Sequence, residues 1–431
     1  MLGKKIFYKK KILIYGLGLS GTSCFQYLSK KNTIEVFDDN SSLKNKKNKN
    51  FFLSKNEIYK KKYDFIVLSP GIDIKKCNLS KYLIKNKNKI ITELDIFYLT
   101  FPENIKITIT GTNGKSTTCQ MLYNIFKSNK LDVRLVGNIG ISPLFEKGIE
   151  KKTIFIIEAS SYQISYSKFF KTDYAAVLNL SPDHLERHGN INQYAKAKLK
   201  LIFNQNKNNI AYIEKNNQII NKEIRNKKLK SKVKKINYSK EIFFKKKIKN
   251  VYLLDKNNLN NIHFVYSISK KFKIPDTRIF GSLNKFRGLK FRKQIIYNKK
   301  NLIIINDSKS TTFSSTKGLL CSYKNIYWVV GGMFKKGDKF LVEKKYYKNI
   351  KAYIIGLNKK YSIDQFRNKI KFQYFGNLKN AMSAIKKDIK NDISLKTILF
   401  SPAAASFDQF NNFEDRGQYF NKIVKSLIIK N

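Results

Sequence analysis

The clearest pattern of apolar positions lies around residue 110, where a strand pattern is followed by a helix pattern. Residues 105–109 alternate between β-branched apolar and polar side chains, which predicts a strand. From 117 to 127 the apolar residues recur at helical spacing, as in Met121, Leu122 and Ile125. Glycines separate the two patterns, so the segment predicts a strand, a tight turn and a helix.

The same succession recurs along the chain. Residues 11–15 predict a strand, 16–21 a glycine-rich turn, 24–28 a helix and 34–38 a second strand. Further strands are predicted at 63–68, 153–158, 174–180, 302–306, 327–332 and just before 400, with short ones at 210–213 and 251–254. Strands that alternate with helices predict an α/β protein with mostly parallel sheets. The Lys/Asn-rich stretch from 205 to 275 suggests no chemistry.

Length and composition set the domain number and exclude some classes of protein. A chain of 431 residues with 42% hydrophobic residues is long enough for two or three domains with real cores. It has no run of 18 apolar residues, so no membrane insertion is predicted. Its four cysteines have neither metal spacing nor a disulfide pattern, which fits a reducing cytoplasm.

The formal net charge of +56 suggests nucleic acid or acidic membranes as partners. However, only eight of the 86 basic residues are arginine, the side chain whose planar fork reads phosphates and bases. The lysines are spread among Asn and Ile, as A/T-rich coding drift would produce. We therefore expect no specific nucleic-acid partner, although a basic polyanion-binding protein with a degenerate ATPase remains an alternative.

Two glycine-rich turns are candidate phosphate sites. In T-G-T-N-G-K-S-T, residues 110–117, backbone N–H groups and the helix end would surround a phosphate, with Lys115 as point charge and Ser116 or Thr117 as Mg²⁺ ligand. The general P-loop pattern has glycine where this chain has Ile109. G-L-G-L-S-G, residues 16–21, with Asp38 after the next strand could hold a dinucleotide, so an oxidoreductase is a further alternative. Glu158, at a strand end, is well placed for Mg²⁺.

The octapeptide at 110–117 resembles the ATP loop of the Mur ligases and of their folylpolyglutamate synthase relatives. G-L-G-L-S-G and S-P-G-I (69–72), N-D-S-K-S-T-T (306–312) and the segment 400–417 are similar to further motifs of that family. The resemblance implies three domains: residues 1–97 as a Rossmann-like UDP-binding domain, 98–291 as a P-loop-type ATPase domain, and 292–431 as a Rossmann-like amino-acid-binding domain.

The resemblance also implies roles for particular residues. Lys115, Lys198 and His184 would be catalytic, and Lys198 would be carbamylated, so that it becomes a bidentate anion beside ATP. The other implied sets are Gly111, Thr112, Asn113, Gly114, Lys115, Ser116, Thr117, Asn284, Arg292, Asp307 and Lys309 for ATP; Ser116, Glu158, His184 and Lys198 for Mg²⁺; Leu19, Ser20, Asp38, Asp39, Gly71 and Asn138 for the UDP substrate; and Thr311, Lys335, Ser406 and Phe413 for D-glutamate.

One segment departs from the family pattern. Family members have a segment similar to G-x-H-N-x-x-N, which is followed by a helical stretch. In this chain the corresponding segment is F-G-S-L-N at 280–284, with Leu283 in place of the histidine. The helical stretch is missing after Asn284, because Phe286 and Arg287 follow at once. This departure puts an adenine contact through Asn284 in doubt.

The function implied by the resemblance is ATP-dependent joining of D-glutamate to UDP-N-acetylmuramoyl-L-alanine through an acyl phosphate. ATP and Mg²⁺ are the expected cofactors, the partners are these small-molecule substrates, and a cytoplasmic monomer is expected. Another Mur-type ligase, or one of the folylpolyglutamate type, is the nearest alternative.

Overall fold

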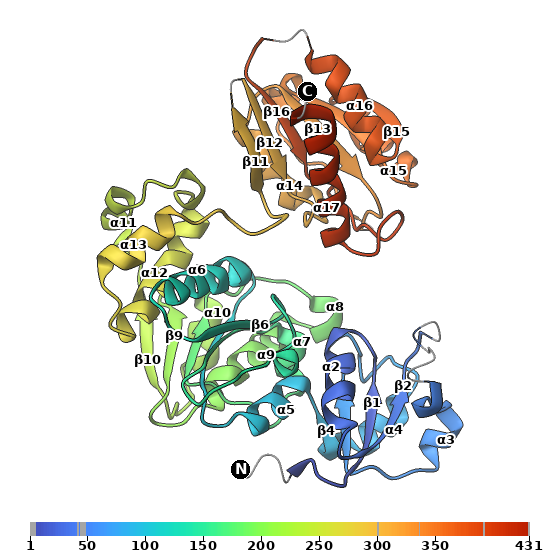
Figure 1. Ribbon diagram of the computed structural model, residues 1–431, viewed down its shortest axis with the longest axis vertical. Helices are drawn as coiled ribbons and strands as arrows, with labels where there is room; N and C mark the ends of the chain where they lie inside the picture. Colours follow the sequence, from blue (N-terminus) through green and yellow to red (C-terminus); the bar gives the residue numbers. More distant parts are fainter. Residues whose placement is uncertain are drawn as a thin grey trace. The chain divides into compact units, whose positions relative to one another are not determined.

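The computed structural model describes residues 6–40, 43, 49–299, 301–335, 337–390 and 393–429. Contacts between Cα atoms divide the chain into two compact units, residues 1–286 and 287–431. The first unit holds two β-sheets and the second holds one (Figure 1). The prediction of an α/β protein with three domains and mostly parallel sheets is therefore confirmed.

The N-terminal domain is a parallel sheet with the strand order β2-β1-β3-β4. Its strands are β1 (Lys11–Tyr15), β2 (Thr33–Phe37), β3 (Phe65–Leu68) and β4 (Ile90–Ile91). Its helices are α2 (Leu19–Leu28), α3 (Lys55–Tyr59), α4 (Ser80–Lys85) and α5 (Glu93–Thr100), with 3-10 turns η2 (Lys49–Phe51) and η3 (Lys87–Lys89). Because the order changes direction at β1, the loops after β1 and β3 diverge at the carboxyl edge, where such sheets bind ligands.

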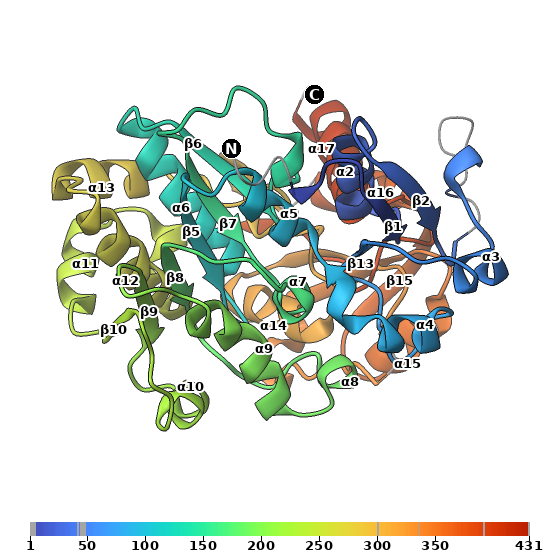
Figure 2. The ribbon, with the colours of Figure 1, turned by 90° about the horizontal axis from the view of Figure 1, so that it is seen from below.

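The central domain is a parallel sheet with the order β10-β9-β8-β5-β7-β6, and Figure 2 shows these strands side by side. The strands are β5 (Ile105–Thr110), β6 (Val133–Gly137), β7 (Ile154–Glu158), β8 (Tyr174–Val177), β9 (Ile210–Glu214) and β10 (Lys232–Ile236). The helices are α6 (Lys115–Ser128), α7 (Ser161–Tyr166), α8 (Leu185–His188), α9 (Ile191–Phe203), α10 (Gln218–Ile224), α11 (Glu241–Lys247), α12 (Lys256–Lys271) and α13 (Asp276–Asn284), with 3-10 turns η4 (Pro143–Phe145) and η5 (Val251–Leu253).

The second unit is a sheet with the order β11-β12-β16-β13-β14-β15, in which only the β11–β12 pair among the described strands is antiparallel. Its strands are β11 (Gln294–Lys299), β12 (Leu302–Asn306), β13 (Ile326–Gly331), β14 (Ile350–Ile355), β15 (Lys371–Gly376) and β16 (Lys396–Phe400). Its helices are α14 (Phe313–Ser322), α15 (Lys359–Phe366), α16 (Leu378–Ile389) and α17 (Phe413–Val424), with the 3-10 helix η6 (Lys344–Asn349) and the π-helical turn η7 (Lys425–Ile429).

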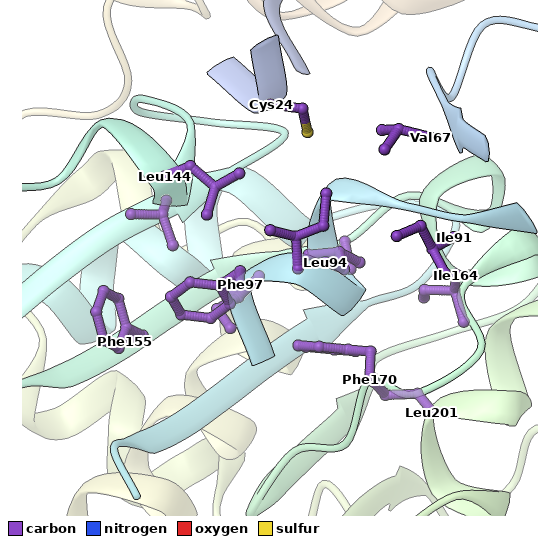
Figure 3. Packing of buried hydrophobic residues seen from close by; sticks show 14 of the residues in the cluster. Cys24, Val67, Ile91, Leu94, Phe97, Leu144, Phe155, Ile164, Phe170 and Leu201 are labelled. Atoms are coloured by element: carbon purple, nitrogen blue, oxygen red, sulfur yellow. The ribbon is translucent and has the colours of Figure 1, made fainter. Parts of the chain in front are cut away.

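One hydrophobic core runs through both domains of the first unit. Leu94 and Phe97 of α5 lie among residues of the N-terminal sheet and of the central sheet, such as Val67 and Phe155 (Figure 3). The opposite face of the central sheet is covered by α6, α12 and α13. Because one core serves both domains, loops of the N-terminal domain can be held at fixed positions against loops of the central one.

The local predictions differ from the structure mainly in the Lys/Asn-rich stretch. The strand expected at 210–213 is β9, whereas the one expected at 251–254 is wrong, because Val251–Leu253 is a 3-10 turn. Residues 256–271, for which no element was predicted, form α12. Its apolar residues recur at helical spacing, with asparagines between the first of them. Among the helices that the structure describes, none has the length and apolar character needed to cross a bilayer.

Candidate active site

The loop between β5 and α6 has the geometry of an anion cradle. Gly114 is the N-cap of α6 in the left-handed conformation (φ 84°), and Gly111 also has a positive φ. A side chain at Gly114 would clash, since a Cβ there would lie 2.3 Å from Oδ1 of Asn261. The first backbone N–H groups of a helix have no acceptor within the helix, so this end can bind phosphate oxygens.

The segment after β8 holds this loop in shape. Thr112 N donates to the carbonyl oxygen of Asn179 at 2.9 Å. Asn113 N donates to Asn179 Oδ1 at 2.8 Å, and Asn179 Nδ2 donates back to Asn113 O at 3.1 Å. Sequence reasoning missed Asn179, although its position directly after a buried strand is where α/β sheets place ligand loops.

Two lysines converge on one carbonyl oxygen of the loop. Lys115 Nζ donates to Gly111 O at 2.9 Å, and Lys198 Nζ donates to the same oxygen at 3.0 Å. Lys198 is 2% exposed on α9, whereas Lys196 is exposed and Lys200 donates to the carbonyls of Ser165 and Ser167. Burial, followed by the charge of Lys115, lowers the pKa of Lys198 to about 7. Two neighbouring cations on one oxygen make this a site for an anion.

Glu158 ends β7 beside this loop and is 1% exposed. Its Oε1 accepts a hydrogen bond from Asn138 Nδ2 at 2.8 Å. Its Oε2 is buried and has no hydrogen-bond partner among the residues that the structure describes. A buried carboxylate oxygen without a donor is costly unless a cation or donor occupies the space beside it, so Glu158 fits a hard cation such as Mg²⁺.

His184 lies on the loop that precedes α8, with its side chain 44% exposed. Its backbone is left-handed (φ 52°), and its ring lies between the carboxylates of Asp183 and Glu186, at 3.5 and 3.6 Å. Gly189 ends α8 directly after His188. Within the described part of the chain no three His, Cys, Asp or Glu side chains gather closely enough to hold a metal ion.

Five of the six residues expected at UDP lie at the carboxyl edge of the N-terminal sheet, and the sixth, Asn138, follows β6 in the central domain. Asp38 Oδ2 accepts from Leu17 N at 2.6 Å, which fixes the glycine-rich loop, and Asp39 accepts from Tyr15 and Asn78. Ser20 donates to Glu93 Oε2 at 2.7 Å, while the side chain of Leu19 is 61% exposed. Gly71 lies on the loop after β3.

Asn284 has a different environment from the one expected. Its Oδ1 accepts from Lys249 N at 2.8 Å and its Nδ2 donates to Lys247 O at 3.1 Å, so both ends of the amide bind backbone near η5. The amide that the fold brings against the loop at 110–117 is that of Asn261, on α12, which packs on α6. The sequence signal was the N-N-L-N-N run at 257–261 on the first turns of a helix.

The residues expected to act from the third domain lie in the second unit. Asp307 is 5% exposed, and it accepts from Ser401 Oγ at 2.7 Å and from Lys293 N at 2.9 Å. Burial raises the pKa of Asp307 to about 6. Lys309 Nζ lies 4.3 Å from the centre of the Phe413 ring. Arg292 and Thr311 are partly exposed, Lys335 is exposed and Ser406 is buried.

Sequence reasoning also missed Arg416. Its guanidinium is buried and donates to the carbonyls of Ser308 and Ala404, at 2.7 and 2.9 Å. Arg416 thus joins the loops after β12 and β16, which carry Asp307 and Ser406. Burial lowers the pKa of this arginine to about 10.

Comparisons with known proteins agree with this geometry. The family described as "Mur ligase middle domain" matches residues 109–284, and "Mur ligase MurD-like, N-terminal domain" matches 10–91. A protein of Rickettsia bellii named UDP-N-acetylmuramoylalanine–D-glutamate ligase is 31% identical, with 97% of this chain and 98% of that protein covered. A protein of the same name from Francisella tularensis subsp. mediasiatica is 34% identical, with 97% and 96% covered.

Solved structures share the fold at low sequence identity. The UDP-N-acetylmuramate-alanine ligase of Thermotoga maritima has a TM-score of 0.58 at 16% identity, with 97% of this chain and 99% of that one covered. A MurF ligase of Thermotoga maritima in complex with ADP has a TM-score of 0.54, also at 16% identity, with 100% and 97% covered. With two family domains in order and relatives above 30% identity along nearly the whole length, the chain belongs to the Mur ligase family.

Proposed function

We propose that this protein is the ATP-dependent ligase that adds D-glutamate to UDP-N-acetylmuramoyl-L-alanine during peptidoglycan precursor synthesis in the cytoplasm. The names of the relatives and the MurD-like N-terminal domain support the choice of substrates. The observation that carries the proposal is the ATP loop, where Lys115 and Lys198 meet on Gly111 O beside the open oxygen of Glu158.

The proposed reaction has two steps. The terminal carboxylate of UDP-N-acetylmuramoyl-L-alanine attacks the γ-phosphorus of ATP, ADP leaves, and an acyl phosphate forms. The amine of D-glutamate then attacks the acyl carbon, loses a proton and expels inorganic phosphate. Lys115 and the N–H groups at the start of α6 would neutralise charge on the transferring phosphoryl group, as preorganised donors do in phosphoryl-transfer enzymes.

Mg²⁺ would be held by Ser116, Glu158, His184 and Lys198 together with the nucleotide, and it would neutralise phosphate charge. Lys198 suits this role if its amine carries CO₂ as a carbamate, because an anion then replaces a cation beside Lys115. Its pKa of about 7 favours this modification, since only the neutral amine can attack CO₂.

The remaining assignments carry over from the family resemblance. We propose Gly111, Thr112, Asn113, Gly114, Ser116, Thr117, Arg292, Asp307 and Lys309 for ATP; Leu19, Ser20, Asp38, Asp39, Gly71 and Asn138 for the UDP substrate; and Thr311, Lys335, Ser406 and Phe413 for D-glutamate. For the amide on the ATP side we favour Asn261 over Asn284, because Asn261 lies against Gly114 and Asn284 binds backbone elsewhere.

The test is phosphate release from ATP and UDP-N-acetylmuramoyl-L-alanine, measured with D-glutamate, L-glutamate, L-alanine or meso-diaminopimelate. We expect release that depends on D-glutamate. Release with a different amino acid would make this another Mur-type ligase, and no release with any of them would overturn the proposal.

The carbamate is tested separately with Lys198→Ala. This variant should lose activity and recover part of it when a short carboxylate such as formate or acetate is added, because the acid can replace the missing anion. Lys196→Ala, on the exposed face of the same helix, is the matched control and should need no rescue. Full activity of Lys198→Ala without added acid would contradict the role.

A further inference from the structure

Arg187 connects the central domain to the loop of the N-terminal domain that is expected to hold UDP. It belongs to α8, three residues after His184, and its side chain is 12% exposed. Its Nη1 donates to Gly71 O at 3.1 Å and its Nη2 donates to Pro70 O at 3.3 Å and to Ile72 O. Three consecutive carbonyls of the S-P-G-I loop thus bind one guanidinium that comes from the other domain.

The same guanidinium also contacts the segment that follows Glu158. It lies 5.0 Å from the centre of the Tyr162 ring and 5.6 Å from that of Tyr166, both on α7. Tyr162 in turn packs against the His184 ring at 5.0 Å and the His188 ring at 5.6 Å. The Arg187 side chain therefore binds the loop expected to hold UDP. Through the Tyr162 ring it also contacts the segment after Glu158 and the ring of His184.

These contacts need an arginine in particular. A guanidinium has five N–H donors in a fixed plane and stacks on aromatic rings, whereas a lysine ammonium is a compact, strongly hydrated charge. A cation that is mostly buried is costly unless dipoles or anions surround it, and here carbonyls, two rings and the Asp73 carboxylate at 3.9 Å do so. Moving the loop after β3 would leave this cation without its partners.

We infer that Arg187 is a positioning residue that fixes the UDP-binding loop relative to the phosphoryl-transfer site, so that occupation of one favours occupation of the other. This inference rests on the proposed function. It follows that the UDP substrate and MgATP bind with positive coupling, and that the coupling passes through the guanidinium. By linkage, each ligand must then raise the affinity for the other by the same factor.

The test compares wild type with Arg187→Met and Arg187→Lys. Affinity for UDP-N-acetylmuramoyl-L-alanine is measured by calorimetry with and without a non-hydrolysable MgATP analogue, and steady-state kinetics are measured in parallel. In Arg187→Met the coupling should vanish and kcat should fall about 100-fold, as expected for a misplacement of about 1 Å, while affinity for the ATP analogue alone changes little. Arg187→Lys should retain the charge without restoring the coupling.

Arg134→Met is the matched control, because that guanidinium pairs with Asp132 and Glu146 inside the central domain. It should keep both coupling and kcat, and thermal unfolding checks that all variants fold. Independent binding of the two ligands to wild type, or unchanged coupling in Arg187→Met, would overturn the inference. A wild-type protein that binds both ligands with coupling but ignores D-glutamate would contradict the proposed function instead.

Discussion

Two strands of the central sheet end in glutamate, and the two carboxylates have opposite environments. Glu214, at the end of β9, accepts from Tyr238 Oη at 2.8 Å and from Asn217 Nδ2 at 3.0 Å, so each oxygen has a donor. Glu158, at the end of β7, has Asn138 on one oxygen, and the other is buried without a partner among the described residues. The local pattern is the same, but β7 lies next to β5, which leads into the loop at 110–117.

This difference teaches how to separate a structural carboxylate from a functional one. Folding normally supplies donors to a buried carboxylate, because an unpaired one costs free energy. Asp95 on α5 is the extreme case in this chain: it is fully buried and accepts from Thr92, Ser167 and the backbone N–H groups of residues 168–170. Both oxygens of Asp95 accept hydrogen bonds, whereas one oxygen of Glu158 has no donor among the described residues. This difference points to a ligand that binds the free oxygen of Glu158.

The largest expected effect is on activity, in Glu158→Gln. The glutamine can still accept from Asn138, but it places an N–H₂ group where the open oxygen faces the proposed cation. We expect kcat to fall by about 10³-fold, the scale of losing one preorganised charge-stabilising group. Thermal stability should stay the same or rise, because a buried unpaired charge is removed.

Glu214→Gln is the control for this change, since it alters the same residue type at the end of another strand of the same sheet. Its activity should match wild type. Equal losses of activity in the two variants would mean that the open oxygen of Glu158 has no special role.

The next effect is on stability, in Asp95→Asn. Asparagine keeps one of the two oxygens, so its N–H₂ group would face either the two Thr92 donors or the Ser167 hydroxyl and the N–H groups of residues 168–170, and that set would lose its acceptor. We expect the free energy of unfolding to fall by about 3 kcal/mol or more, measured by urea unfolding. Glu103→Gln, which removes an exposed pair with Lys151 (3.1 Å), should cost no more than about 1 kcal/mol. Specific activity of the folded Asp95→Asn protein should remain high; a loss as large as that of Glu158→Gln would break the distinction.

The local spacing of apolar residues and glycines predicted the fold class and the loop at 110–117, whereas the three domains were expected from the family resemblance. The partner that a side chain meets is a tertiary property, and there the sequence was insufficient. Glu158 and Glu214 look alike as strand ends, and nothing in the sequence singled out Arg187. Asn261 stood in a stretch that suggested no chemistry, since its approach to Gly114 exists only once α12 packs on α6.

The smallest expected effect concerns Asp307. This carboxylate is buried, and among the described residues it accepts from only the Ser401 hydroxyl and the Lys293 N–H. Its number of donors therefore lies between that of Glu158 and that of Asp95. Burial raises its pKa from 3.8 to about 6. The folded state therefore binds the proton more tightly than the unfolded state, so the stability of the second unit should fall as pH rises from about 4 to about 6. The expected loss is about 3 kcal/mol at most, because each unit of the shift from 3.8 to about 6 is worth about 1.4 kcal/mol.

Trp328 makes this effect measurable in the whole protein. It is the single tryptophan of the chain, it is buried in the second unit, and its indole N–H donates to Ser401 O at 2.8 Å, next to the hydroxyl that binds Asp307. Unfolding of the second unit can thus be followed by tryptophan fluorescence at pH 4 to 7 in wild type and in Asp307→Asn. Subtracting the two curves cancels the other carboxylates, and the difference should slope downward with rising pH. A difference that does not change with pH would mean that two donors stabilise the charged form of Asp307 as well as the larger set stabilises that of Asp95. Of these three carboxylates, only Glu158 would then lack a donor that it needs.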